Sequence, residues 1–201
     1  MGKLLEQIYE WDNLLQAWAK IKKKKKTCPG VDGLTVSKFE KDYQTNLKKL
    51  QQQLSNHSYY PIPLLRFYVA KNSNPDAKRA ISVPSIPDRI VQQAVLNVIT
   101  PMLDPRFSEC SYAYRNGRSI LTAISKIQDL RDQGLVWVVD ADIYSFFDSI
   151  HHSILKSQIK KYIHDQELQE VLFSWFEASV VEYPPEGDRL KYNLKTGIPQ
   201  G

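Results

Sequence analysis

The sequence is poor in cysteine and has no long hydrophobic run, and each absence excludes a class of protein. Cys28 and Cys110 are the only cysteines among 201 residues, and they are too far apart to resemble a metal-binding pair. We therefore expect two free thiols, as is usual in a reducing compartment. No apolar stretch approaches the length of a membrane span, and the first residues lack a signal-peptide pattern. The sequence thus predicts a cytoplasmic protein with no membrane partner.

Positive charge is concentrated near one end of the chain. The first 50 residues hold 11 lysines and 6 acidic residues, which accounts for the whole net charge of +5. A lysine run is suited to nucleic-acid phosphates because binding releases counterions, but most such runs are simply solvated. Both readings stay open for the unbroken run of Lys22, Lys23, Lys24, Lys25 and Lys26.

Hydrophobic periodicity predicts an α+β fold. Apolar residues at helical spacing predict helices over residues 4–18, 36–55, 88–103, 118–133 and 153–179. Turn residues between short apolar runs predict two hairpins, one from strands 64–70 and 79–83 and one from strands 180–183 and 190–194. The connection Lys71–Lys78 is expected to be a mobile loop.

A further apolar run, Leu135–Val139, leads directly into Asp140 and Asp142. This pattern predicts a buried strand whose end carries carboxylates, followed by an aromatic turn. Carboxylates at such a position can hold Mg²⁺, which prefers oxygen ligands and substrate phosphates. A surface turn with acidic residues is the alternative.

Five motifs follow one another in a fixed order. They are Gly30-Val31-Asp32-Gly33, Asp88-Arg89-Ile90-Val91-Gln92, Ser111-Tyr112-Ala113-Tyr114-Arg115-Asn116-Gly117-Arg118, the segment with Asp140 and Asp142 (the acidic segment), and Gly197-Ile198-Pro199-Gln200-Gly201. This series resembles the reverse transcriptases of the group II intron class, including the CRISPR-associated branch, over residues 13–201.

The resemblance implies the fingers and the first part of the palm of a right-hand polymerase, truncated before the second catalytic motif and the thumb. The palm sheet is expected to be largely antiparallel, with Asp142 at a strand end. Residues 1–92 would form the fingers with a helical extension, 93–150 the first part of the palm, and 151–201 a return through the fingers toward the next palm segment.

The resemblance also implies roles for residues around the acidic segment. Asp142 matches the first metal-binding aspartate, joined by the Ile143 carbonyl, of a site that holds two Mg²⁺ ions, with Mn²⁺ as a substitute. Asp140 is either an electrostatic helper or a bystander. Phe147 matches the aromatic plate beneath the incoming sugar, which favours deoxynucleotides, while Phe146 is expected to pack in the core. Asp148 is expected to cap the following helix.

Other residues are assigned to the nucleotide and the template. Lys71 and Arg79 match cations that clamp the phosphates of the incoming nucleotide, with Lys78 as a competitor, and Gln200 matches a glutamine beside the nucleotide. Template or primer contacts are implied for Arg89, Gln92, Arg115 and Arg118. The alternatives are helix capping and surface polarity for Arg89 and Gln92, and a structural ion pair for Arg115. For His151 and His152 we favour a structural role over a metal site.

The sequence lacks the aromatic-Ala-Asp-Asp turn of the family, since no Asp-Asp pair occurs in it. A lone Asp142 cannot organise two ions, so we expect this polypeptide alone to be silent and its parent to be an RNA-directed DNA polymerase. The implied partners are an RNA template, a DNA or RNA primer and dNTPs, with an intron RNA or a CRISPR integrase as further candidates. The alternatives are a nucleic-acid-binding module that kept the polymerase fold, and a scaffold that binds a partner protein through the Trp11–Trp18 helix.

Overall fold

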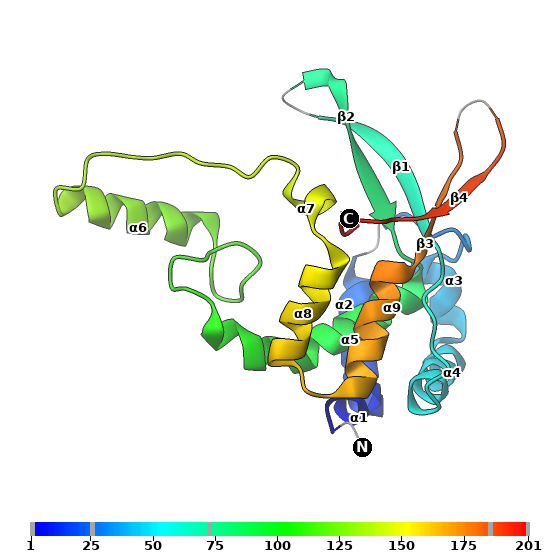
Figure 1. The fold of residues 1–201 in the computed structure, drawn as a ribbon. Coiled ribbons are helices and arrows are strands. Elements are labelled where there is room, and N and C mark those ends of the chain that lie inside the picture. Colours follow the sequence, from blue (N-terminus) through cyan, green and yellow to red (C-terminus); the bar gives the residue numbers. More distant parts are fainter. Residues whose placement is uncertain (1–2, 25–26, 72–73, 185–186, 200–201) are drawn as a thin grey trace. The chain divides into compact units, whose positions relative to one another are not determined.

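A computed structural model describes residues 3–24, 27–71, 74–184 and 187–199, which form an α+β fold (Figure 1). The chain divides into two compact units, one made of residues 1–98 with 145–201 and the other of residues 99–144. The larger unit holds the sheet and the buried hydrophobic core of the described residues.

α4 and α5 bury apolar stripes at the predicted positions, whereas α7 and α8 bury no residue. Polar residues divide two of the predicted helices. Glu10 separates α1 from α2, and Asp42 separates α3 from α4. Trp18 of α2 packs on Phe39 of α3, with ring centroids 4.8 Å apart. The bounds are α1 (Lys3–Tyr9), α2 (Trp11–Lys23), α3 (Val36–Lys41), α4 (Tyr43–Ser55), α5 (Ile86–Leu103, which runs into the smaller unit), α7 (Phe146–Ser149), α8 (His152–Tyr162) and α9 (Gln166–Glu177).

The long helix predicted over residues 153–179 is also two helices, because Asp165 begins a new one. Its carboxylate accepts from Leu168 N–H of α9 at 3.0 Å and from the backbone N–H groups of Leu4 and Leu5 in α1 at 2.9 and 3.1 Å. One side chain thus satisfies unpaired N–H groups at the starts of two helices. This contact ties the first helix of the chain to α9.

Four strands form the sheet, in the order β2-β1-β3-β4. β1 (Leu64–Lys71) pairs antiparallel with β2 (Asn74–Val83) and parallel with β3 (Ser179–Glu182), and β3 pairs antiparallel with β4 (Leu190–Asn193). Both predicted hairpins are confirmed. β2 starts at Asn74, so much of the expected loop over residues 71–78 is strand instead.

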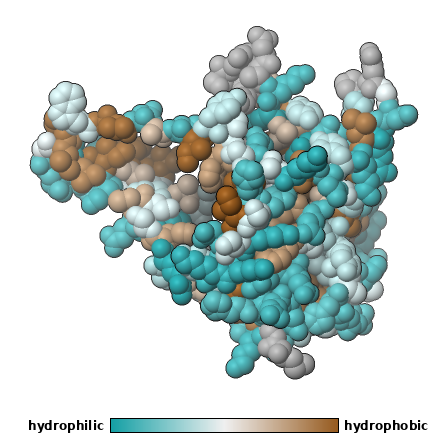
Figure 2. Space-filling view, viewed as in Figure 1, coloured by the Kyte–Doolittle hydropathy of each residue, from teal (hydrophilic) through white to brown (hydrophobic). Residues whose placement is uncertain are grey.

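The smaller unit contains the end of α5, a short 3₁₀ helix η1 (Asp104–Arg106) and α6 (Ile120–Asp132). α5 ends at Leu103, as the sequence predicted, although Pro101 lies inside it. Ser119 and Thr122 form a capping box at the start of α6. The apolar side of α6 is exposed, and Figure 2 shows hydrophobic residues gathered on this part of the chain. Its exposed members include Ile120, Leu121 and Ile127.

Candidate nucleotide and template site

The turn that follows the acidic segment is bonded to the last described residues of the chain. Ile198 N–H donates to the Phe147 carbonyl at 2.9 Å, and Gly197 N–H donates to the Ile150 carbonyl at 2.8 Å. Residues 197–199, which we call the strap, are therefore anchored on α7, the helix that carries Phe147.

Gly197 meets two requirements that other residues fail. Its φ of +82° is in the left-handed region, and a Cβ added there would lie 2.9 Å from both the Cα and the carbonyl oxygen of Asp148.

Asp148 itself lies inside α7, and the N-cap of α8 is His151 without a side-chain bond. The prediction that Asp148 caps the following helix is therefore wrong.

His152 adds a side-chain hydrogen bond to the contact between the strap and the turn. Its Nε2 lies 2.7 Å from the Gly197 carbonyl oxygen, and its ring centroid lies 6.0 Å from that of Phe176 in α9. Because a carbonyl only accepts, Nε2 carries the proton in this contact. These contacts confirm the structural interpretation of His152.

Phe146 and Phe147 lie edge to face, with ring centroids 5.4 Å apart. Phe147 is 41% exposed, as a residue that meets a substrate would be, but Phe146 is 48% exposed. The expectation that Phe146 packs in the core is wrong in this structure. The two neighbouring aromatics are thus both accessible.

The register of the β1–β2 hairpin separates the two basic residues that competed for one role. Arg79 pairs with Val69 and Lys78 pairs with Ala70, so the alternation of a strand places them on opposite faces of the sheet. Ile81, on the face of Arg79, and Ser82, on the face of Lys78, both line the groove described next. Lys71 is the last residue of β1.

A groove of about 480 Å³ runs between the end of α2, β2 and α5. Arg89 is part of its wall, and its side chain donates to the Pro84 carbonyl at 2.8 Å and the Cys28 carbonyl at 2.5 Å. Burial lowers the pKa of the Arg89 guanidinium, and Cys28 and Asp32 oppose that shift. The Arg89 side chain thus joins two loops. The rest of the lining is Ile21, Lys24, Thr27, Ile81, Ser82, Val83, Gln92, Gln93 and Leu96.

Asp88 is a buried hub whose importance the sequence did not reveal. One carboxylate oxygen accepts from the Tyr59 hydroxyl at 2.8 Å, and the other accepts from the Ser85 hydroxyl at 2.7 Å and from Ile62 N–H at 3.0 Å. Trp175 Nε1 in turn donates to the Tyr59 hydroxyl at 3.1 Å. Burial raises the pKa of Asp88, and the hydrogen bonds from Ser85, Tyr59 and Ile62 oppose that rise. The only signal in the sequence was the place of Asp88 in a motif.

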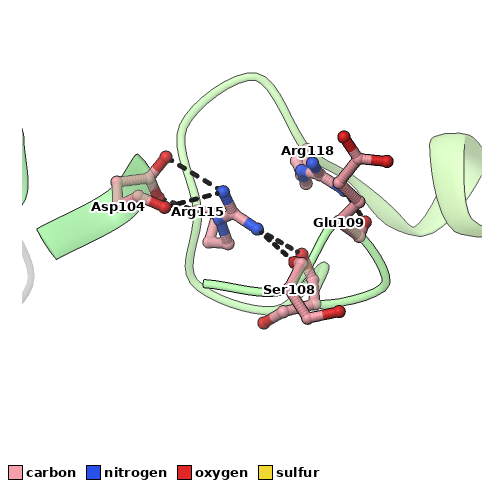
Figure 3. Close-up of polar contacts among 6 residues, drawn as sticks. Asp104, Ser108, Glu109, Arg115 and Arg118 are labelled. Carbon is pink, nitrogen blue, oxygen red and sulfur yellow. Dashed lines mark hydrogen bonds and ion pairs between the residues drawn. The ribbon is translucent and has the colours of Figure 1, made fainter. Parts of the chain in front are cut away.

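In the smaller unit, Arg115 forms the structural ion pair that was its alternative role. Its guanidinium donates to both Asp104 carboxylate oxygens, at 2.9 and 3.1 Å, and to the carbonyls of Ser108 and Ser111 (Figure 3). Arg115 thereby lowers the pKa of Asp104. Arg118 donates to the Glu109 carbonyl. Both arginines hold the loop that precedes α6.

The acidic segment lies in the same unit and differs from the prediction. Residues 135–143 form neither helix nor strand, and Val139 is 92% exposed. The buried strand that would end at Asp142 is absent here, because the described part of the chain offers this segment no strand to pair with. Asp140 and Asp142 are both exposed.

The lysine run is only partly described. Lys22 pairs with Glu40 at 2.5 Å, and Lys23 and Lys24 are exposed. Lys25, Lys26 and Gln200 lie outside the described residues.

Comparison with known proteins gives the family. Residues 69–201 match the model of "Reverse transcriptase (RNA-dependent DNA polymerase)". Because the match covers more than half of the chain, the chain belongs to the reverse transcriptase family, and its α+β fold is that of polymerase fingers with part of a palm.

Two relatives and one solved structure show how the chain compares. It is 30% identical to Protein YkfC of Escherichia coli over 86% of this chain and 45% of YkfC. It is 30% identical to the group II intron-encoded protein LtrA of Lactococcus lactis over 79% of this chain and 25% of LtrA. A chain of a partial Cas6-RT-Cas1–Cas2 complex superposes with a TM-score of 0.60 at 28% identity, covering all of this chain and 32% of that one. The chain therefore spans less than half the length of each.

The side chains of the described residues do not by themselves form a site for the divalent metals that this family uses. Within the ranges that the structure describes, no three His, Cys, Asp or Glu side chains gather in a metal-binding arrangement. Asp142 with the Ile143 carbonyl does not amount to a two-ion site.

No helix among the residues that the structure describes is both long and apolar enough to cross a membrane.

Proposed function

We propose that this chain supplies the fingers and the first part of the palm of a group II intron-like reverse transcriptase, which copies RNA into DNA. One observation carries the proposal beyond family membership. The strap, which leads to Gln200, is hydrogen-bonded to the backbone of the turn that presents Phe147. Two segments about 50 residues apart, each matching a nucleotide-binding motif, thus meet in one place.

On the nucleotide side, Phe147 would contact the sugar and Gln200 would lie beside the nucleotide. Lys71 and Arg79, at the end of the β1–β2 hairpin, would bind its phosphates, Arg79 through its bidentate fork. Lys78 stays a competitor, because Ile81 on the face of Arg79 and Ser82 on the face of Lys78 both line the groove.

On the template side, the groove between α2, β2 and α5 is the strongest candidate. Lys24 and Gln92 line it, and the run Lys22–Lys26 begins at its edge. Lys24 and the adjoining lysines would attract the phosphates of a single-stranded template, and the apolar lining residues would contact its bases. Arg89 would act there by fixing the loop at Cys28. Arg115 and Arg118 keep a proposed contact with the template–primer backbone, through the loop that they hold.

The chemistry of the parent enzyme would use two Mg²⁺ ions, for which Mn²⁺ can substitute, and Asp142 with the Ile143 carbonyl would be their first ligands here. The remaining carboxylates must come from outside this sequence, which has no Asp-Asp pair. We therefore propose that the 201-residue polypeptide alone binds template and primer but does not polymerise.

The division into fingers (1–92), palm (93–150) and a return segment (151–201) is part of this proposal. The partners would be an RNA template, a DNA or RNA primer and dNTPs in the cytoplasm. An intron RNA is a further candidate because LtrA is a group II intron-encoded protein. A CRISPR integrase is another because the solved relative lies in a complex with Cas1 and Cas2.

Sugar discrimination tests this proposal. Primer extension by the full-length parent is measured with each dNTP and the matching rNTP. We expect Phe147→Val to lower the dNTP-to-rNTP ratio of kcat/KM by at least about tenfold, since one steric contact of this size accounts for about 1–3 kcal/mol. Phe146→Val, at the neighbouring exposed aromatic, is the matched control. An unchanged ratio in Phe147→Val would refute the assignment.

A further inference from the structure

Part of the strap faces a cavity. Ile198 and Pro199 line a cavity of about 190 Å³, together with Leu64 of β1 and Phe176 of α9. A segment that faces a cavity lacks dispersion contacts on that side. Hydrogen bonds from its neighbours therefore help to fix its position.

Among the described residues, three hydrogen bonds join the strap to the turn around α7 and to α8. Two are the backbone hydrogen bonds of Gly197 and Ile198 to the turn around α7, and the third is the bond from His152 Nε2 to the Gly197 carbonyl. His152 is the only side chain among the three. It belongs to the first turn of α8, so it links the strap to a second helix.

We propose that His152 is a positioning residue for nucleotide binding, which acts by holding the strap against the turn that carries Phe147. This inference rests on the proposed function. The neutral Nε2–H tautomer and the imidazolium both donate from Nε2, so the contact does not require a charged ring. The role of His152 is therefore to supply a donor at a fixed reach.

A set of three variants separates this role from packing. His152→Gln keeps an N–H donor at a similar reach but loses the ring contact with Phe176, and His152→Leu loses both. His151→Leu changes the adjacent exposed histidine, which makes no side-chain cap bond to α8, and serves as the matched control. A difference between the Gln and Leu variants reports the hydrogen bond alone.

The first measurement needs no activity. In the 201-residue chain, amide hydrogen exchange at Gly197 and Ile198 should be about tenfold faster in His152→Leu, as the loss of one hydrogen bond predicts, and close to wild type in His152→Gln and His151→Leu. Unchanged exchange in His152→Leu, or equal acceleration in His152→Gln, would overturn the proposal.

The second measurement is made in the full-length parent. We expect His152→Leu to raise the KM for dNTP by about tenfold while its affinity for template–primer stays unchanged, and His152→Gln to restore KM to within about twofold. Loss of template–primer affinity in parallel with KM would refute a positioning role. If exchange responds as expected but no form of the parent extends a primer, the proposed function fails while the contact of His152 with the strap stands.

Discussion

Removal of one hydroxyl from the buried Asp88 hub should have a cost that depends on pH. In Tyr59→Phe the Asp88 carboxylate loses the donor at 2.8 Å, and Trp175 Nε1 loses its acceptor at 3.1 Å. Both Tyr59 and Asp88 are buried, and the change leaves no large cavity. A hydrogen bond to a charged group contributes about 1.5–3 kcal/mol. We therefore expect the free energy of unfolding to fall by about 2–3 kcal/mol at neutral pH.

The sign of the pH dependence follows from linkage. Burial raises the folded-state pKa of Asp88 above 3.8, so its ionisation opposes folding as pH rises from 3.8 through the folded pKa. The Tyr59 hydrogen bond lowers that pKa, so Tyr59→Phe raises it further. The stability difference between wild type and variant should therefore grow as pH rises from the folded-state pKa of Asp88 in the wild type to its higher value in the variant. Above that second pKa the difference should stay level.

Urea unfolding followed by tryptophan fluorescence at about pH 4 and at neutral pH measures this difference. Tyr60→Phe, at an adjacent tyrosine that is 77% exposed, is the matched control and should change stability by less than about 0.5 kcal/mol. An equal cost of Tyr59→Phe at both pH values would show that the contact does not depend on an ionised Asp88.

Three further predictions concern the strap, the smaller unit and the lysine run. Gly197→Ala should lower the free energy of unfolding in urea by about 2–4 kcal/mol, because the new Cβ makes close contacts in addition to the left-handed backbone strain. Gly33→Ala is the control, since its Cβ adds the strain alone (φ +64°, no atom within 4 Å of the added Cβ). An equal loss of stability in the two variants would contradict this reasoning. Arg115→Lys should speed amide exchange over residues 104–118, because lysine cannot bond both Asp104 oxygens. Because the pKa of Asp104 is lowered in the folded state, protection in the wild type should persist down to pH 3.8 and be lost as pH falls through the folded-state pKa. Full protection in the lysine variant would refute the role of the bidentate guanidinium. Replacement of the five lysines Lys22–Lys26 by glutamine should reduce the slope of log K against log salt for RNA binding by up to about 3.5, at about 0.7 per phosphate contact. An unchanged slope would mean that the run is solvated.

Local patterns predicted most of the larger unit. The helices and both hairpins lie close to their predicted positions, because the apolar stripe of α4 and the turn residues around the hairpins are local signals. The breaks at Glu10, Asp42 and Asp165 were missed because the apolar spacing continues across them. Of these three residues, Asp165 is the one whose side chain caps a helix, and the N–H groups that it binds in α1 are about 160 residues away in the sequence.

What the sequence could not give depends on distant partners. Leu135–Val139 has the composition of a strand, but a strand also needs a neighbour, and none pairs with it among the residues described. Asp88 reads as an ordinary acidic residue in the first turn of a helix until Tyr59, 29 residues earlier, is placed beside it. The resemblance named Phe147 and Gln200, but the contact of the strap with α7 came from the structure.

RNA-templated primer extension by the full-length parent tests the central claim most directly, with Asp142→Ala and Asp140→Ala measured beside the wild type. The account predicts DNA synthesis that requires Mg²⁺ or Mn²⁺, falls by at least about a thousandfold in Asp142→Ala, as the loss of a group essential to metal-assisted transfer implies, and largely survives in Asp140→Ala. Synthesis that persists in Asp142→Ala, or a folded wild type that binds template and primer without extending it, would contradict the account.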